Sequence, residues 1–91
     1  ASGAPGAAKL ALIEADKLAD DILKKLGLQG EHMADRLEKI KPGELASLEK
    51  LWRAHRLRND LVHTPYFRLA SNSASQALLD YEAFFKELKL L

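Results

Sequence analysis

The sequence predicts a single all-α domain, a small bundle of four amphipathic helices. Apolar residues recur at spacings of three and four through most of the chain, which is the period of a helix with one buried face. The alternation of apolar and polar residues that marks a half-buried strand does not occur, and there is no internal repeat. A chain of 91 residues has room for one domain, which buries only about three fifths of its unfolded surface. A partner subunit would therefore add to its stability.

The N-terminal part divides into a linker and a first helix. Residues 1–8, ASGAPGAA, are small and nearly featureless and indicate a flexible linker or a scar left by cloning, and residues 9–91 form the helical domain. The first helix is expected from Ala8 to Leu26. Its apolar stripe consists of Leu10, Ile13, Leu18, Ile22 and Leu26. Gly27 is placed to end this helix in a left-handed cap.

Two further helices are expected on either side of a proline–glycine break. The second covers about residues 31–40, and Pro42 and Gly43 end it because proline lacks the backbone donor and restricts the residue before it. The third runs from Glu44 to about Val62, and Pro65 prevents it from continuing much further. One of its faces carries Leu45, Leu48, Trp52, His55, Asn59 and Val62, so that the stripe is apolar at first and polar later.

The fourth helix is expected after a short irregular connection and extends to the C-terminus. Ser73 and Gln76 have the spacing of a capping box at its start. The apolar residues of this helix run from Ala74 to Leu88, and six residues of the chain are predicted to form the common core: Leu18, Ile22, Leu48, Trp52, Leu78 and Tyr81.

Composition excludes several classes of site. The chain has no cysteine, so disulfides, a thiol nucleophile and cysteine-ligated metals are ruled out, and a reducing, cytoplasmic location is expected. No apolar run approaches the roughly 18 residues of a membrane span and no signal peptide is visible, so this segment is not expected to insert into a membrane. No cofactor or metal is expected.

The positive charge is concentrated in one segment. The net charge of the chain is only +1, yet residues 50–68 carry five bases (Lys50, Arg53, Arg56, Arg58 and Arg68) against one acid, Asp60. Such a segment is the footprint of a phosphate-bearing partner, and Arg53, Arg56 and Arg68 are the candidate contacts to its phosphates. The alternative is an ordinary solvated helix face.

The same segment contains a polar constellation suited to a phosphodiester. Asn59 and His63 are four residues apart, so on a helix they share a face and can hydrogen-bond, and Arg58 lies about 100° away around the axis. Histidine can exchange a proton near neutral pH, and arginine is a permanent, bidentate ligand for phosphate oxygens. The alternative is that these residues are structural. His55, on the face of Trp52, is expected to be a partly buried structural histidine.

The segment from Leu51 to His63, LWRAHRLRNDLVH, resembles the core motif of the HEPN superfamily (higher eukaryote and prokaryote nucleotide-binding domains). That motif is an arginine and a polar residue, followed after a short spacer by histidine. Arg58, Asn59 and His63 match it in order and spacing. The helical pattern resembles small bacterial HEPN-like domains over residues 8–91, while only the Arg-Asn-His segment is specific.

The resemblance implies a function and an assembly. Many HEPN proteins are metal-independent endoribonucleases whose two-fold dimers place two copies of the motif across a shared cleft. By this resemblance Arg58 would bind the scissile phosphate, His63 would transfer protons, and Asn59 would orient His63. Other HEPN-like domains are inactive modules for dimerisation or partner binding. Two hypotheses follow: a homodimer that binds or cleaves RNA, and a non-catalytic interaction module within a larger protein.

Overall fold

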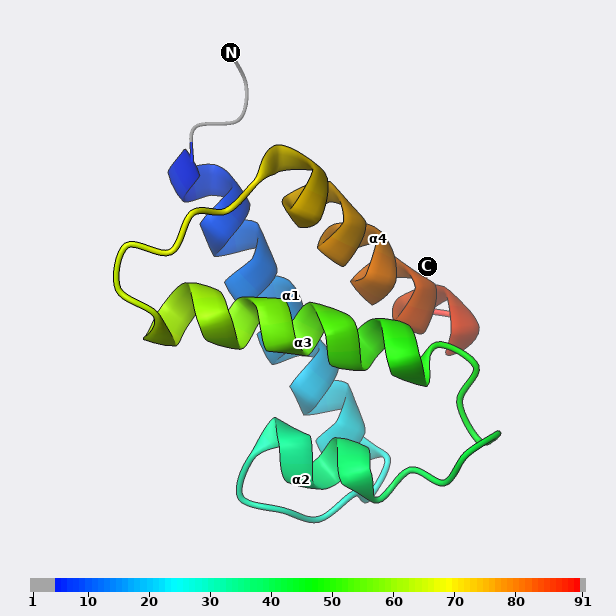
Figure 1. Cartoon of the computed structure of the whole chain (residues 1–91). Coiled ribbons are helices and arrows are strands. Elements are labelled where there is room, and N and C mark those ends of the chain that lie inside the picture. Colours follow the sequence, from blue (N-terminus) through cyan, green and yellow to red (C-terminus); the bar gives the residue numbers. More distant parts are fainter. Residues whose placement is uncertain (1–4, 91) are drawn as a thin grey trace.

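The structure of the chain is a computed structural model that describes residues 5–90, and within this range it contains four helices and no strand. The helices are α1 (Pro5–Lys25), α2 (Met33–Glu38), α3 (Leu48–His63) and α4 (Ser71–Glu87). The predicted all-α fold is therefore confirmed. The long helix α3 lies across α1, α4 packs against both, and the short α2 packs against α1 (Figure 1). None of these four helices is long and apolar enough to cross a bilayer.

The ends of α1 follow from local backbone chemistry. The helix begins at Pro5 rather than at Ala8, and proline is well suited to the first helical position because its missing N–H would have no partner there. The rest of the predicted linker, residues 1–4, lies outside the described residues. At the other end Gly27 has a φ of 88°, and the N–H groups of Gly27 and Leu28 donate to the carbonyls of Lys24 and Leu23. This is the left-handed cap that the sequence predicts.

The buried face of α1 differs from the predicted stripe. The residues that it buries are spaced four, three and four apart: Leu12, Asp16, Ala19 and Leu23. Leu18 is 52% exposed, so its predicted place in the core is wrong, and Ile22 is only partly buried. The reason is Asp16, a charged residue in the middle of the buried face. A prediction based on apolar residues alone leaves out the face that contains an aspartate and therefore assigns a neighbouring face of the helix to the core.

The buried face of α3 is also displaced from the prediction. It consists of Leu51, Ala54, His55 and Leu61. Leu48 and Trp52 are partly buried against the edge of the core, and Val62 is exposed. The guanidinium of Arg56 lies over the Trp52 ring at 5.8 Å, which covers part of the indole. The prediction that Trp52 is a central core residue is therefore wrong.

The core face of α4 is largely as predicted. Ala74, Ala77, Tyr81 and Phe84 are buried, whereas Leu78 is 37% exposed and does not belong to the core. The helix begins at Ser71 without a side-chain cap, so Ser73 lies inside its first turn and the predicted capping box of Ser73 and Gln76 is absent. Gln76 instead donates a hydrogen bond to Asp80 at 3.1 Å. The helix ends at Glu87, four residues before the C-terminus of the chain.

The start of α3 is set by the end of α4. The Glu87 carboxylate accepts hydrogen bonds from the backbone N–H groups of Ala46 and Ser47, each at 2.7 Å. A carboxylate at this position satisfies the backbone donors immediately before the helix and complements the positive end of the helix dipole. Hydrogen bonds from Ser47 and from the backbone of Ala46 also lower the pKa of Glu87 below its usual value. The helix consequently begins at Leu48 and not at the predicted Glu44.

A second acidic residue of α4, Asp80, joins α4 to α3. Its carboxylate accepts two hydrogen bonds from the Arg53 guanidinium, from Nε at 2.9 Å and from Nη2 at 2.8 Å. Burial by itself would raise the pKa of Asp80, but hydrogen bonds from Arg53 and Gln76 outweigh this effect and lower the pKa below its usual value. Arg53 therefore stabilises the packing of α3 against α4.

Acidification should reveal the contribution of Asp80. A carboxylate whose folded-state pKa is lowered stabilises the fold above its ordinary pKa of 3.8, and loses that effect as the pH falls through the folded-state pKa. We expect Asp80→Asn to lower the free energy of unfolding by about 1.5–3 kcal/mol near neutral pH, the range for hydrogen bonds to charged groups. The difference should shrink below pH 3.8. Denaturant titrations of the unsubstituted chain and of Asp80→Asn at a series of pH values measure this difference in free energy. A difference that grows on acidification would contradict this account.

Candidate functional site

The three residues of the HEPN-like motif line one open groove. Arg58, Asn59 and His63 project from the C-terminal half of α3 into a space of about 610 Å³ between α1, α3 and the start of α2, which we call the motif groove. The other side chains that line it are Ile13, Asp16, Lys17, Asp20, Lys24, Glu31, His32, Met33, Ala34, Arg36 and His55. The geometry therefore brings together the residues that the sequence singled out.

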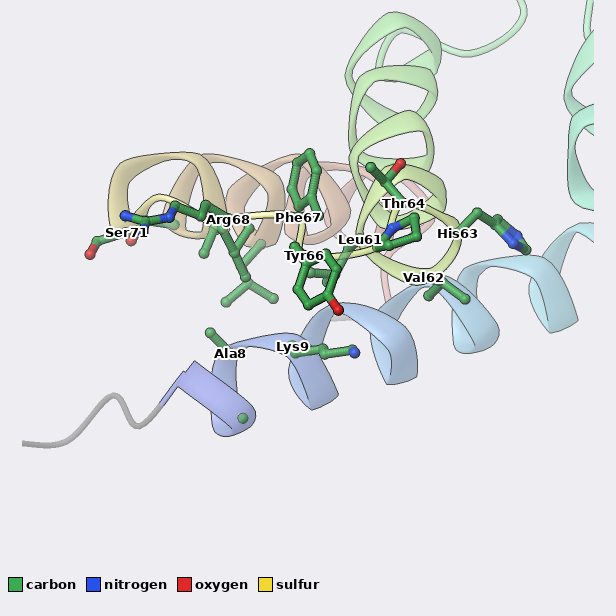
Figure 2. A pocket seen from close by; sticks show the side chains of 16 residues that line it. Ala8, Lys9, Leu61, Val62, His63, Thr64, Tyr66, Phe67, Arg68 and Ser71 are labelled. Carbon is green, nitrogen blue, oxygen red and sulfur yellow. The ribbon is translucent and has the colours of Figure 1, made fainter.

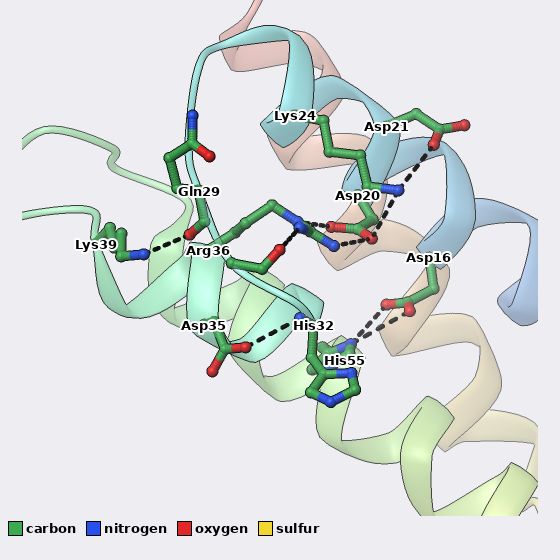
Figure 3. Close-up of polar contacts among 11 residues, drawn as sticks. Asp16, Asp20, Asp21, Lys24, Gln29, His32, Asp35, Arg36, Lys39 and His55 are labelled. Atoms are coloured by element: carbon green, nitrogen blue, oxygen red, sulfur yellow. Dashed lines mark hydrogen bonds and ion pairs between the residues drawn. The ribbon is translucent and has the colours of Figure 1, made fainter.

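Beneath the groove lies a chain of buried polar contacts that joins three helices. Asp16 of α1 is only 4% exposed, and its Oδ1 accepts a hydrogen bond from the Tyr81 hydroxyl of α4 at 2.7 Å. The Nδ1 atom of His55, on α3, lies 3.0 Å and 3.2 Å from the two Asp16 oxygens (Figure 3). Burial and the nearby Asp16 carboxylate raise the pKa of Tyr81, so the hydroxyl stays protonated and remains a donor.

Hydrogen-bond directions in this chain determine the form of His55. The Nη1 atom of Arg58 donates to Asn59 Oδ1 at 3.0 Å, so the Nδ2 side of the amide faces His55, 3.2 Å from Nε2. An amide nitrogen can only donate, hence Nε2 accepts, and the His55 proton is on Nδ1 facing Asp16. His55 is therefore the satisfied structural histidine that the sequence predicts. Asn59 bonds His55 and Arg58, and the expected hydrogen bond to His63 is not formed.

The other two motif residues that line the groove, Arg58 and His63, differ in how they are held. The Arg58 side chain is 28% exposed, and its Nε lies 3.5 Å from Asp16 Oδ2 without forming a hydrogen bond. Within residues 5–90 the Nη2 atom of Arg58 has no hydrogen-bond acceptor, so that corner of the guanidinium can bind an anion. His63 is exposed at the end of α3, next to the groove. Arg58 is held in place from below, whereas His63 is open to solvent.

The opposite wall of the groove is also braced by an ion pair. Arg36 of α2 is buried, and its Nε and Nη2 donate to the two oxygens of Asp20 on α1, at 2.6 Å and 2.9 Å (Figure 3). Burial lowers the pKa of Arg36, but the hydrogen bonds and charge of Asp20 raise it overall, so the guanidinium stays charged. This pair fixes α2 against α1 although α2 has only six residues.

The three arginines predicted to contact RNA do not line the motif groove with Arg58. Arg53 faces α4 and is paired with Asp80, and Arg56 lies over the Trp52 ring. Arg68 lies in the loop between α3 and α4. Because successive helical residues are about 100° apart, bases that are close in the sequence point in different directions. In one copy of the chain, the segment from Lys50 to Arg68 therefore does not form a single basic face.

Charges in the motif groove are nearly balanced. Its lining contains four lysines and arginines (Lys17, Lys24, Arg36 and Arg58) and three acids (Asp16, Asp20 and Glu31). Among residues 5–90 there is no group of three or more histidine, aspartate and glutamate side chains arranged to hold a metal ion. The arrangement therefore offers one positioned cation, Arg58, and two exposed imidazoles, His63 of the motif and His32, within a largely neutralised setting.

Sequence reasoning did not identify Asp16 and Tyr81 as parts of this site. Tyr81 was assigned to the core, and its hydroxyl needs a partner there because a buried phenol without a hydrogen bond is costly. Asp16 lies four residues after Leu12 and three before Ala19, in register with the buried face of α1. An acidic residue at the helical spacing of buried apolar residues is the sequence signal that could have predicted this buried hydrogen-bond network.

Comparison of the chain with protein-family models, with curated proteins and with solved structures finds no match. The likeness to HEPN domains is thus carried by the motif and the helical pattern alone. The chemistry of the groove has to be derived from its own residues.

Proposed function

We propose that this chain is a HEPN-like domain that binds and cleaves single-stranded RNA without a metal, with two copies of the chain completing the site. The observation that supports this most is the placement of Arg58 and His63 on one open groove, with Arg58 held by Asn59 and Asp16 and with His63 exposed. A positioned guanidinium and a free imidazole are the two groups that this cleavage requires.

The reaction would use a hydroxyl of the RNA as its nucleophile. As the ribose 2′-oxygen attacks the adjacent phosphorus, it loses its proton, the bond from phosphorus to the 5′-oxygen breaks, and that oxygen gains a proton. The products are a 2′,3′-cyclic phosphate end and a 5′-hydroxyl end. His63 of one copy would accept the first proton and His63 of the second copy would donate the last. Arg58 would bind the phosphate oxygens, where negative charge builds up in the transition state.

The network below the groove gives Arg58 a defined position. Because Asn59 is fixed by His55, and His55 by Asp16, the guanidinium is oriented before a ligand arrives. A group that is already oriented binds the transition state without first losing its own rotational freedom. In this proposal Asn59 positions Arg58 and not His63.

A test needs only the purified chain and RNA. Incubation with a mixed-sequence single-stranded RNA in EDTA should yield fragments with cyclic phosphate ends. Arg58→Ala should weaken RNA binding and reduce the slope of log affinity against log salt by about 0.7, the effect of one lost phosphate contact on a single strand. Arg56→Ala is the matched control, since it removes an arginine of the same helix that lies over Trp52 and not in the groove.

The outcomes separate binding from folding. Arg58 is partly buried beside Asp16, so the unfolding transition of Arg58→Ala has to be recorded alongside its affinity. A variant that folds and binds RNA as tightly as the unsubstituted chain would contradict the role of Arg58. Absence of both cleavage and salt-sensitive RNA binding in the unsubstituted chain would exclude the nuclease.

The second candidate is a non-catalytic dimerisation or interaction module. The observation that favours it is the buried network itself, in which Asp16, His55 and Tyr81 join α1, α3 and α4 without any ligand. Arg58 and Asn59 already have partners within this network. Exposed apolar side chains such as Leu18 and Leu79 would suit a protein partner or a second copy. This candidate predicts a stable dimer in sedimentation and no effect of the chain on RNA.

A further inference from the structure

A second groove meets the motif groove at His63. It has a volume of about 1080 Å³ and lies between the first turns of α1, the end of α3 and the loop that leads to α4 (Figure 2). We call it the loop groove. Leu61, Phe67, Leu69 and Ala74 supply its apolar walls. His63 lines both grooves, so a linear ligand bound at the motif groove can continue past His63 into the loop groove.

Ionic side chains in the loop groove are of one sign. Among the described residues that line it, the charged ones are Lys9 of α1 and Arg68 of the loop, and none is an aspartate or a glutamate. The motif groove, in contrast, contains both signs. An apolar groove bordered only by bases favours a ligand that combines a flat or apolar part with negative charge.

Tyr66 in this groove has an unusual conformation. The turn from Thr64 to Phe67 is closed by the Phe67 N–H, which donates to the Thr64 carbonyl at 3.2 Å, and Pro65 occupies its first central position. Tyr66 occupies the second central position with a φ of 58°, in a left-handed region that glycine or asparagine occupies more readily. The side chain is 100% exposed, so the ring contributes nothing to the core. A strained backbone that presents an exposed aromatic ring indicates a binding role.

From these observations we infer that the loop groove binds the nucleotide next to the phosphate held by Arg58, with its base stacked on Tyr66 and its own phosphate facing Lys9. Figure 2 shows Tyr66, Phe67 and Arg68 on the loop and Lys9 on the neighbouring α1. Exposed aromatic rings beside bases are how proteins bind single-stranded nucleic acid, because every base has a face that can stack. This inference rests on the proposed function and identifies how the same site would hold a strand.

The stacking of a base on Tyr66 and the binding of its phosphate by a basic side chain can be tested by separate substitutions. The probe is a fluorescein-labelled oligoadenylate of about ten nucleotides, long enough to cover a single-strand site, with 2′-O-methyl groups that block cleavage. Tyr66→Ala should weaken its binding by about 5- to 150-fold, the range for loss of one stacked base. Tyr66→Phe should bind normally, since phenylalanine keeps the ring. Because purines stack more strongly, the unsubstituted chain should prefer oligoadenylate over oligouridylate, and Tyr66→Ala should lose that preference.

Charge is tested with a matched pair on α1. Lys9→Ala should reduce the salt slope of oligoadenylate binding by about 0.7. Lys25→Ala removes an exposed lysine from the same helix about 24 Å further along its axis, at 1.5 Å per residue, and should leave the slope unchanged. Equal effects of the two substitutions would mean that the protein attracts RNA only through its general charge, and would overturn the assignment of Lys9.

Failure of this inference is distinguishable from failure of the proposed function. If Tyr66→Ala and Lys9→Ala bind as the unsubstituted chain does while Arg58→Ala is impaired, the loop groove does not hold RNA and the proposed function stands. If the unsubstituted chain binds neither oligonucleotide, both fall. Sedimentation of Tyr66→Ala shows whether a loss of affinity comes from a loss of self-association. If the variant no longer self-associates and this accounts for its weaker RNA binding, the groove holds a second copy of the chain and the nucleotide site is excluded.

Discussion

Replacement of His63 by alanine is expected to slow RNA cleavage by about 10²–10⁴-fold, the usual contribution of a general acid or base. The proposed reaction needs a group that takes a proton from the 2′-hydroxyl and a group that returns one to the 5′-oxygen, and His63 is the exposed imidazole beside Arg58. The measurement is the rate of appearance of cyclic phosphate ends under single-turnover conditions in EDTA. RNA affinity should change much less than the rate, because the imidazole acts mainly in the transition state.

The control for this experiment is another histidine of the motif groove. His32 lines the same groove and is largely exposed, but it is not part of the motif, so His32→Ala should cleave at the normal rate. Since the His63 side chain is exposed, His63→Ala should keep the free energy of unfolding within about 0.5 kcal/mol. Cleavage by His63→Ala at the unsubstituted rate would remove His63 from the mechanism.

Replacement of Asp16 by alanine is expected to lower the free energy of unfolding by about 3–5 kcal/mol, the range for removing one partner from a buried charge pair. The substitution leaves the Tyr81 hydroxyl and the His55 Nδ1–H without their shared acceptor, and removes the carboxylate that lies 3.5 Å from Arg58 Nε. For a domain of this size such a loss is a large part of the total stability. Denaturant titration followed by the Trp52 fluorescence measures it.

Asp21 provides the matched control on α1. Its carboxylate lies on the surface, 3.9 Å from Lys24, and exposed pairs of this kind contribute little, so Asp21→Ala should change stability by less than about 1 kcal/mol. Asp16→Asn keeps an oxygen that can accept the hydrogen bond from Tyr81, so its loss of stability should lie between those of Asp16→Ala and Asp21→Ala. If Asp16→Ala cost no more than Asp21→Ala, the network would not be the buried junction of the three long helices.

The positions of the helices could be predicted because the signals that define them act over a few residues. The three- and four-residue spacing of apolar side chains, Gly27 after α1, and the two prolines at residues 42 and 65 each constrain the backbone locally. The start of α3 was predicted four residues too early. It is defined by hydrogen bonds from Ala46 and Ser47 to Glu87, a residue about 40 positions away.

The motif was predicted correctly as a group, while its internal contacts were not. Helical spacing placed Arg58, Asn59 and His63 near one another, and all three line the motif groove. The same spacing allows Asn59 to bond either His63, four residues later, or His55, four residues earlier. His55 is the partner because it is buried and held by Asp16. Periodicity cannot distinguish the two directions along a helix.

By itself, then, the sequence determined the all-α class, the four helices, the left-handed cap of α1 at Gly27 and the grouping of Arg58, Asn59 and His63. Only the tertiary structure decided which faces are buried and which polar groups are joined. Asp16 can occupy the core because Tyr81, 65 residues away, and His55, 39 residues away, satisfy its oxygens when α1, α3 and α4 pack together. The physical reason is that burying a charge depends on partners that only the packed helices bring within hydrogen-bond distance.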